Sequence, residues 1–150
     1  MSNSVLQRPI PAVAMTVEDR REPELALRTV CVLALLSIAL IHLLDLPGTI
    51  GGDPTQGTLY LLLMGACVAS GFVLLHTVAR GAWLLAGAIA ASTAVAYVLT
   101  RTVGLPFDHA DIGNWGDPLG IASLFVEGIV ILAAGYGIWL GRRRIAPAQA

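Results

Sequence analysis

The chain has 150 residues, of which 56% are hydrophobic and 13% are charged, and its mean hydropathy is +0.76. Soluble domains have about 45–50% apolar and about 25% charged residues, so this composition is typical of an integral membrane protein. The formal net charge of -1 gives no reason to expect nucleic acid as a partner, and the lipid bilayer is the partner that the composition indicates.

A proline-containing stretch precedes four apolar runs. Residues 1–24 contain three prolines and charges of both signs, and we expect them to form a disordered or interfacial cytoplasmic tail. Each apolar run has about the 20 residues that a helix needs to cross roughly 30 Å of hydrocarbon. We therefore predict an all-α membrane protein, a bundle of four transmembrane helices within a membrane domain over 25–141, followed by a basic cytoplasmic tail over 142–150. The helices are predicted at about 25–46, 58–79, 82–104 and 118–141.

The segments between the runs carry turn and cap residues. Residues 46–57, LPGTIGGDPTQG, are rich in Pro, Gly and Asp and are predicted to be a link. Arg80 and Gly81 leave room for only a very tight connection, which predicts an antiparallel hairpin of the second and third helices. Asp117 is expected to cap the fourth helix, with Pro118 at its first helical position.

The arginines are distributed unevenly about the four runs. By the positive-inside rule, this distribution places both termini in the cytoplasm, with the links that contain Asp53, Asp108, Asp111 and Asp117 outside. Only Arg101 approaches the outer side. The arginines on the other side are Arg8, Arg20, Arg21, Arg28, Arg80, Arg142, Arg143 and Arg144.

Small residues recur at steps of four in the third and fourth runs. In lipid, this spacing allows helix backbones to approach closely. It indicates either packing within one chain or a dimer face on the fourth helix, which would make a homo-oligomer. The residues are Ala86, Ala90 and Ala94 in the third run and Ala133, Gly137 and Gly141 in the fourth.

Common catalytic signatures are missing from the sequence. It contains no HExxH, GxSxG or CxxC motif and no phosphate-binding glycine loop. Cys31 and Cys67 lie inside apolar runs, which does not indicate a disulfide scaffold. Trp83, Trp115 and Trp139 are expected near the two membrane interfaces, where aromatic belts form. The sequence thus gives no reason to expect an enzyme.

Glu127 is the most unusual residue of the apolar runs. It lies nine residues beyond Pro118, which at about 1.5 Å per residue is about 14 Å along the fourth helix and near the bilayer centre. A carboxylate there costs several kcal/mol unless it is paired, hydrated or protonated, so Glu127 should face the bundle interior. Arg101, near the outer end of the third helix, is its candidate partner, unless that arginine extends to the interface instead.

Further polar residues are expected in the same leaflet. His42 and Asp45 are three residues apart near the outer end of the first helix, which places them on one face. The link before the fourth helix adds Asp108, His109 and Asp111.

These residues allow four interpretations. The first is a structural polar network of His42, Asp45, Arg101 and Glu127 that pins and caps the helices. A zinc or copper site is the second, because imidazole and carboxylate ligands suit those metals. The third is a proton or ion path, and the fourth is haem or quinone binding, with His42 and His109 as the conceivable haem ligands. The metal site would use His42, Asp45, His109 and Asp111, and the path would use Glu127, His42 and Asp45.

The segment RTVGLPFDHADIGNWGDPLGIASLFVEGIVI, residues 101–131, resembles the link between the third and fourth helices of small, uncharacterised four-helix membrane proteins of actinobacteria. Their pattern is an Arg-Thr-x-Gly-Leu-Pro exit, a Trp-x-x-Pro-Leu-Gly start of the next helix, and then Ser-Leu-x-x-Glu. A histidine near the outer end of the first helix is also similar, at His42. The resemblance covers about a fifth of the chain and implies the fold and an Arg101–Glu127 pair, but no activity. The matching residues are Arg101, Thr102, Gly104, Leu105, Pro106, Trp115, Pro118, Leu119, Gly120, Ser123, Leu124 and Glu127.

Two functions follow as expectations for a multi-pass protein of the bacterial plasma membrane. The first is a non-enzymatic accessory or structural subunit, whose outer polar cluster holds the bundle together or meets a protein partner or a second copy. The alternative is a metal-binding or proton- or ion-handling protein that uses His42, Asp45, Glu127 and His109. No particular cofactor is indicated.

Overall fold

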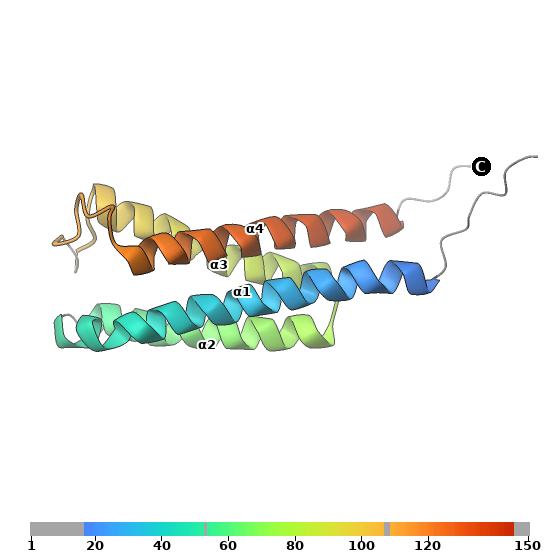
Figure 1. The fold of residues 1–150 in the computed structure, drawn as a ribbon, viewed down its shortest axis with the longest axis horizontal. Helices are drawn as coiled ribbons and strands as arrows, with labels where there is room; N and C mark the ends of the chain where they lie inside the picture. The colour runs from blue at the N-terminus through green and yellow to red at the C-terminus, as the bar shows by residue number, and fades with distance from the viewer. Residues whose placement is uncertain (1–16, 53, 107–108, 146–150) are drawn as a thin grey trace, which may run out of the picture.

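The computed structural model describes residues 17–52, 54–106 and 109–145. These residues form four helices, α1 (Val17–Gly52), α2 (Pro54–His76), α3 (Arg80–Thr102) and α4 (Pro118–Ile145), packed as a four-helix bundle (Figure 1). The predicted all-α, four-helix fold is therefore confirmed. The expectations for residues 1–16, Asp53, Asp108 and residues 146–150 concern positions outside the described residues.

All four helices are long and apolar enough to cross a membrane. The candidate spans have 23–31 residues and mean hydropathies of 1.8–2.3. Large apolar side chains cover the outside of the bundle, and Leu62, Phe72, Phe125 and Leu132 are each 62–75% exposed. Such a surface is stable against lipid but not against water, so the chain has the structure of a multi-pass membrane protein.

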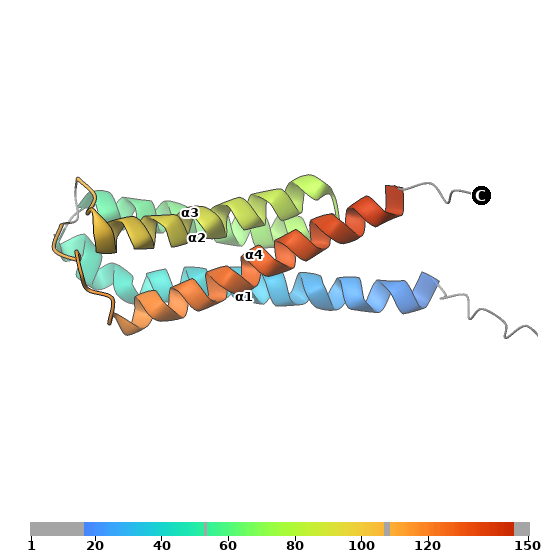
Figure 2. The same ribbon diagram turned by 90° about the horizontal axis from the view of Figure 1, so that it is seen from above.

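The bundle has two distinct ends. The α1–α2 and α3–α4 links lie at one end, which we call the loop end, and the α2–α3 link lies at the other, with the start of α1 and the finish of α4 (Figure 1). Helix α1 packs along α2 and α4, and α3 packs along α4, whereas the contact between α2 and α3 is less extensive than these three. Figure 2 shows α3 and α4 diverging toward the loop end.

The first helix is longer than predicted at both ends. It begins at Val17 and runs through Pro23 and Pro47 to Gly52, so residues 17–24 of the predicted tail and residues 46–52 of the predicted link are helical. Membrane helices tolerate proline because neighbouring groups satisfy the backbone that it frees.

The loop-end extension of α1 is held by close packing on α2. A Cβ atom added to Gly57 would lie 2.5 Å from Ile50 Cγ1, so the absence of a side chain at Gly57 allows α1 to continue alongside. In residues 46–57, a glycine that would be usual in a loop therefore allows two helices to pack closely.

The remaining boundaries lie within a few residues of the predictions. Helix α2 ends at His76 and α3 begins at Arg80, which confirms the tight antiparallel hairpin. Helix α4 begins at Pro118 as predicted but continues to Ile145, so residues 142–145 of the predicted tail are helical.

Small residues of α3 and α4 pack inside the chain. Ala86 and Ala90 have no exposed area, and a Cβ atom on Gly137 would lie 2.5 Å from Trp83 Cδ2. Ala133 and Gly137 are also buried inside the bundle, whereas Gly141, the third residue of this row, is exposed. The same contact buries Trp83, which corrects the expectation that it lies in an interfacial belt.

Candidate functional site

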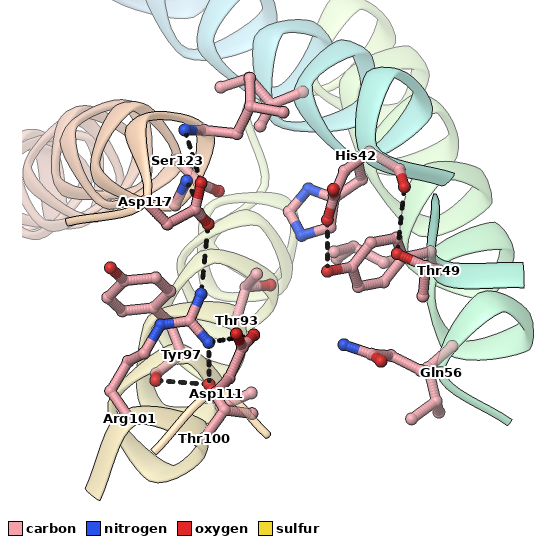
Figure 3. A pocket seen from close by; sticks show the side chains of 18 of the residues that line it. His42, Thr49, Gln56, Thr93, Tyr97, Thr100, Arg101, Asp111, Asp117 and Ser123 are labelled. Atoms are coloured by element: carbon pink, nitrogen blue, oxygen red, sulfur yellow. Dashed lines mark hydrogen bonds and ion pairs between the residues drawn. The ribbon is translucent and has the colours of Figure 1, made fainter. Parts of the chain in front are cut away.

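A cavity of about 600 Å³ lies in the loop-end half of the bundle. All four helices and the α3–α4 link contribute to its walls (Figure 3). Its volume falls within the range of about 300–1,000 Å³ that is usual for small-molecule sites. The acidic, basic and histidine side chains of the lining are His42, Asp45, Arg101, Asp111, Asp117 and Glu127.

Arg101 joins three segments at the loop end. Its Nη1 donates to the Asp111 carboxylate, and its Nη2 lies 3.2 Å from Asp117 Oδ2. The guanidinium carbon also lies 4.7 Å from the centre of the Tyr97 ring, in the geometry of a cation–π contact. We call Arg101, Asp111 and Asp117 the arginine clamp, because they tie the end of α3 to the link and to the start of α4.

Asp117 has a second role in the clamp. Its carboxylate accepts hydrogen bonds from the backbone N–H groups of Leu119 and Gly120, at 3.1 and 3.2 Å. These bonds satisfy two N–H groups that a helix start otherwise leaves without a partner, which confirms the predicted N-cap. One side chain thus fixes where α4 begins and holds it to Arg101.

The predicted pair between Arg101 and Glu127 does not form. Both terminal nitrogens of Arg101 are engaged by the link carboxylates. Asp117 stands at the start of α4, and Glu127 lies ten residues further along, about 15 Å at the helical rise per residue. The partners of Arg101 are instead Asp111, predicted as a possible metal ligand, and Asp117, predicted as the N-cap of the fourth helix.

Glu127 lies at the deep part of the cavity lining and has no exposed area. Its Oε1 accepts a hydrogen bond of 2.7 Å from Ser123 Oγ, one helical turn earlier. Its Oε2 is buried and has no hydrogen-bond partner in the described part of the chain. Buried polar atoms nearly always have partners, so the hydrogen bonding of this carboxylate is incomplete within the described residues.

Two further buried atoms of the lining share this property. Arg101 Nε and Tyr97 Oη have no hydrogen-bond partner among the described residues. Together with Glu127, these lining residues include a donor, a hydroxyl and an acceptor whose hydrogen bonding is incomplete within the described residues. The lining is therefore suited to a polar occupant.

His42 lies across the cavity from Arg101 (Figure 3). Asp45 and Tyr60 line the same cavity and form a group with His42. Tyr60 Oη donates to Asp45 Oδ2 at 3.0 Å, and the Tyr60 ring lies edge-on to the His42 ring with centroids 4.7 Å apart. His42 Nδ1 lies 2.9 Å from the Ile38 carbonyl oxygen. A hydrogen bond to that carbonyl requires the proton on Nδ1, so the neutral ring keeps Nε2 as an acceptor.

The structure does not assemble the predicted metal site. His109 is exposed in the link and is not part of the cavity lining, and Asp111 is engaged by Arg101. Residues 17–52, 54–106 and 109–145 contain no group of three or more His, Cys, Asp or Glu side chains that could hold a metal ion. The His42–His109 pair considered for haem likewise does not share the cavity.

Sequence reasoning missed several lining residues. Tyr60 donates a hydrogen bond to Asp45, a contact that the sequence did not predict. Ser123 precedes Glu127 by four residues, and Tyr97 precedes Arg101 by four, so both pairs share a helical face. That spacing was the available signal for Ser123 and Tyr97.

No protein-family model, curated protein or solved structure matches this chain. What the site binds follows from its own chemistry. Carboxylates outnumber the guanidinium four to one in the lining, and two of those four already neutralise it.

Proposed function

We propose that the chain is a multi-pass protein of the bacterial plasma membrane that binds a small polar solute or ion in a cavity open to the outside. One observation carries this proposal. Glu127 is fully buried near the middle of a membrane helix, it lines a cavity of solute size, and one of its oxygens has no hydrogen-bond partner among the described residues.

A purely structural role accounts for Glu127 poorly. An ionisable group at this depth costs several kcal/mol, and replacing buried charges by apolar residues often stabilises a protein. A residue that only held the bundle would use both carboxylate oxygens, whereas Glu127 bonds Ser123 through one. Such a group is usually retained for what it binds.

The arginine clamp favours a second candidate, the accessory or structural subunit. Arg101 is 6% exposed, and its ion pairs join α3, the link and α4 without any solute. The clamp explains Arg101, Asp111 and Asp117 but leaves Glu127 and His42 without a role. We therefore place the structural role in the clamp and the binding role deeper in the cavity.

Two sequence features support the orientation and the membrane. The arginines gather at the end of the bundle that holds the termini, which by the positive-inside rule makes that end cytoplasmic. The loop end and the cavity mouth then face outward. The resemblance of residues 101–131 to small actinobacterial membrane proteins supports a bacterial plasma membrane.

Two buried serines provide a matched test of the cavity. Ser123 and Ser70 are 5% and 1% exposed, but only Ser123 lines the cavity. Each is changed to Cys in a Cys31→Ala, Cys67→Ala background, so that the introduced thiol is the sole thiol. A membrane-impermeant methanethiosulfonate is then added outside spheroplasts, and the modification rate is measured.

We expect Ser123→Cys to react at least tenfold faster than Ser70→Cys, because water and reagent reach only the cavity. Equal, slow modification of both thiols contradicts an open cavity. Modification of Ser123→Cys only in inverted vesicles contradicts the outward orientation instead.

A further inference from the structure

The charge of the cavity selects among solutes. Its carboxylates are Asp45, Asp111, Asp117 and Glu127, and its guanidinium is Arg101. Asp111 and Asp117 neutralise Arg101, while Asp45 accepts a hydrogen bond from a neutral tyrosine. The groups that remain are negative, so the lining attracts cations and repels anions.

Glu127 lines the cavity and has one carboxylate oxygen, Oε2, without a hydrogen-bond partner among the described residues. We infer that the cavity binds a small organic ammonium cation whose –NH₃⁺ group donates to Glu127 Oε2, an inference that rests on the proposed solute-binding function. A buried carboxylate interacts with a cation more strongly than an exposed one, because the surrounding dielectric constant is lower. The ammonium ion also completes the hydrogen bonding that the protein leaves open at this oxygen.

Neighbouring acceptors suit the other ammonium protons. An ammonium group has three donors and no acceptor. His42 Nε2 is an acceptor on the same cavity, because the bond of Nδ1 to Ile38 fixes the tautomer. Ser123 Oγ keeps lone pairs after donating its proton to Glu127.

The rest of the lining suits a short carbon chain. Apolar side chains of Ile41, Leu63 and Ala96 share the cavity with the polar groups. Arg101 Nε is a donor with no partner in the described residues, but the charge of its guanidinium is already neutralised. It therefore needs a neutral acceptor, such as water or a hydroxyl oxygen, and does not demand an anion.

Three four-carbon probes separate charge from hydrophobicity. The protein is purified in a non-ionic detergent, and the saturable shift of its thermal unfolding midpoint is measured against n-butylammonium, n-butanol and butyrate. We expect n-butylammonium to bind at least tenfold more tightly than n-butanol, and butyrate to produce no saturable shift. Butyrate binding as tightly as n-butylammonium would overturn the inference, as would the absence of any ammonium effect.

Variants then locate the recognition group. Glu127→Gln keeps the shape of the side chain and removes its charge, and it should weaken n-butylammonium binding at least tenfold. Glu22→Gln, at an exposed position at the opposite end of the bundle, is the charge-matched control and should leave the affinity unchanged. Unchanged binding by Glu127→Gln overturns the assignment of this residue.

The outcomes remain distinguishable if Glu127→Gln does not fold, because the three probes are compared on the wild-type protein. A reactive Ser123→Cys thiol without ammonium binding contradicts only the cation inference. An unreactive Ser123→Cys thiol contradicts the open cavity and removes the basis for both proposals.

Discussion

Arg101 and Glu127 illustrate two ways in which a membrane helix accommodates charge. Arg101 lies near a helix end, where the link folds back and supplies two carboxylates. Glu127 lies deeper, where a serine hydroxyl supplies one hydrogen bond. The first residue is compensated within the chain, and for the second we have proposed a solute in the cavity as the further partner.

Double-mutant cycles should separate these two residues. Arg101→Gln should lower the free energy of unfolding by about 2 kcal/mol, less than the about 3–5 kcal/mol of a fully buried pair because Asp111 and Asp117 are about a third exposed. Asp117→Asn removes the ion pair but keeps a good N-cap residue. We expect coupling of at least about 0.5 kcal/mol between Arg101→Gln and Asp117→Asn, measured by unfolding in detergent.

The same cycle with Glu127→Gln is the control. Arg101 and Glu127 share no hydrogen bond or ion pair, so their effects should add within about 0.5 kcal/mol. Strong coupling between Arg101 and Glu127 would instead support the direct ion pair that the sequence predicted.

At the residue scale, the sequence predicted which groups matter better than it predicted their partners. The spacing of His42 and Asp45 correctly placed both on one face, because that face depends only on helical geometry. The bond of Asp45 to Tyr60 depends on how α2 lies against α1, which no local pattern encodes. Arg101 was paired with the wrong carboxylate for the same reason.

Two helix contacts in this bundle depend on glycines, which have no side chain. Gly137 lets the Trp83 ring lie directly against the backbone of α4, and Gly57 does the same for Ile50 at the start of α2. Close approach matters in lipid, where apolar burial gives little drive for helices to associate and van der Waals contact provides much of the stability.

Two glycines on α4 give a matched test of this packing. Gly137→Ala would bring a methyl group to 2.5 Å from the Trp83 ring, which forces α3 and α4 apart. We expect it to lower the free energy of unfolding by about 1–3 kcal/mol. Gly135→Ala has nothing within 4 Å and should leave stability unchanged or raise it by up to about 1 kcal/mol.

Unfolding in detergent micelles, followed by circular dichroism, measures both variants. If Gly137→Ala is as stable as Gly135→Ala, the contact between Trp83 and α4 does not contribute as the geometry indicates.

At the element scale, signals with a local mechanism were reliable. Asp117 followed by Pro118 predicted the start of α4, because the cap and the first turn involve only neighbouring residues. Pro47 and the glycines after it predicted a link, and the helix continues through them. In a bundle, those same residues can favour close packing, and the sequence alone does not distinguish the two uses.

The whole molecule places its large apolar residues outside and its small and polar residues inside. Ala86, Ala90 and Glu127 have no exposed area, while Phe125 and Leu132 are more than 70% exposed. The composition and the length of the apolar runs suffice to predict an integral membrane protein, because both depend on whether lipid or water surrounds the helices. The cavity arises from the relative placement of four helices and could not be read from any single run.

Thiol labelling at the two ends should reveal the orientation of the whole bundle. Ile112 lies in the α3–α4 link and Gly81 at the α2–α3 end, and both are exposed. In the background without native cysteines, Ile112→Cys should react with an impermeant maleimide outside spheroplasts, and Gly81→Cys only after permeabilisation, because the positive-inside rule predicts that the arginine-rich end is cytoplasmic. The reverse pattern would invert the proposed topology.

The depth of Glu127 has an electrical consequence. In a cell whose interior is negative, a cation that enters from the outside and stops halfway across the membrane moves through about half of the transmembrane voltage. A full crossing is worth about 2.3 kcal/mol per charge at 100 mV, so half is worth about 1 kcal/mol, or roughly a fivefold change in occupancy. An energised cell would therefore fill this cavity at lower solute concentrations than a de-energised cell, and the bundle would report on voltage as well as on concentration.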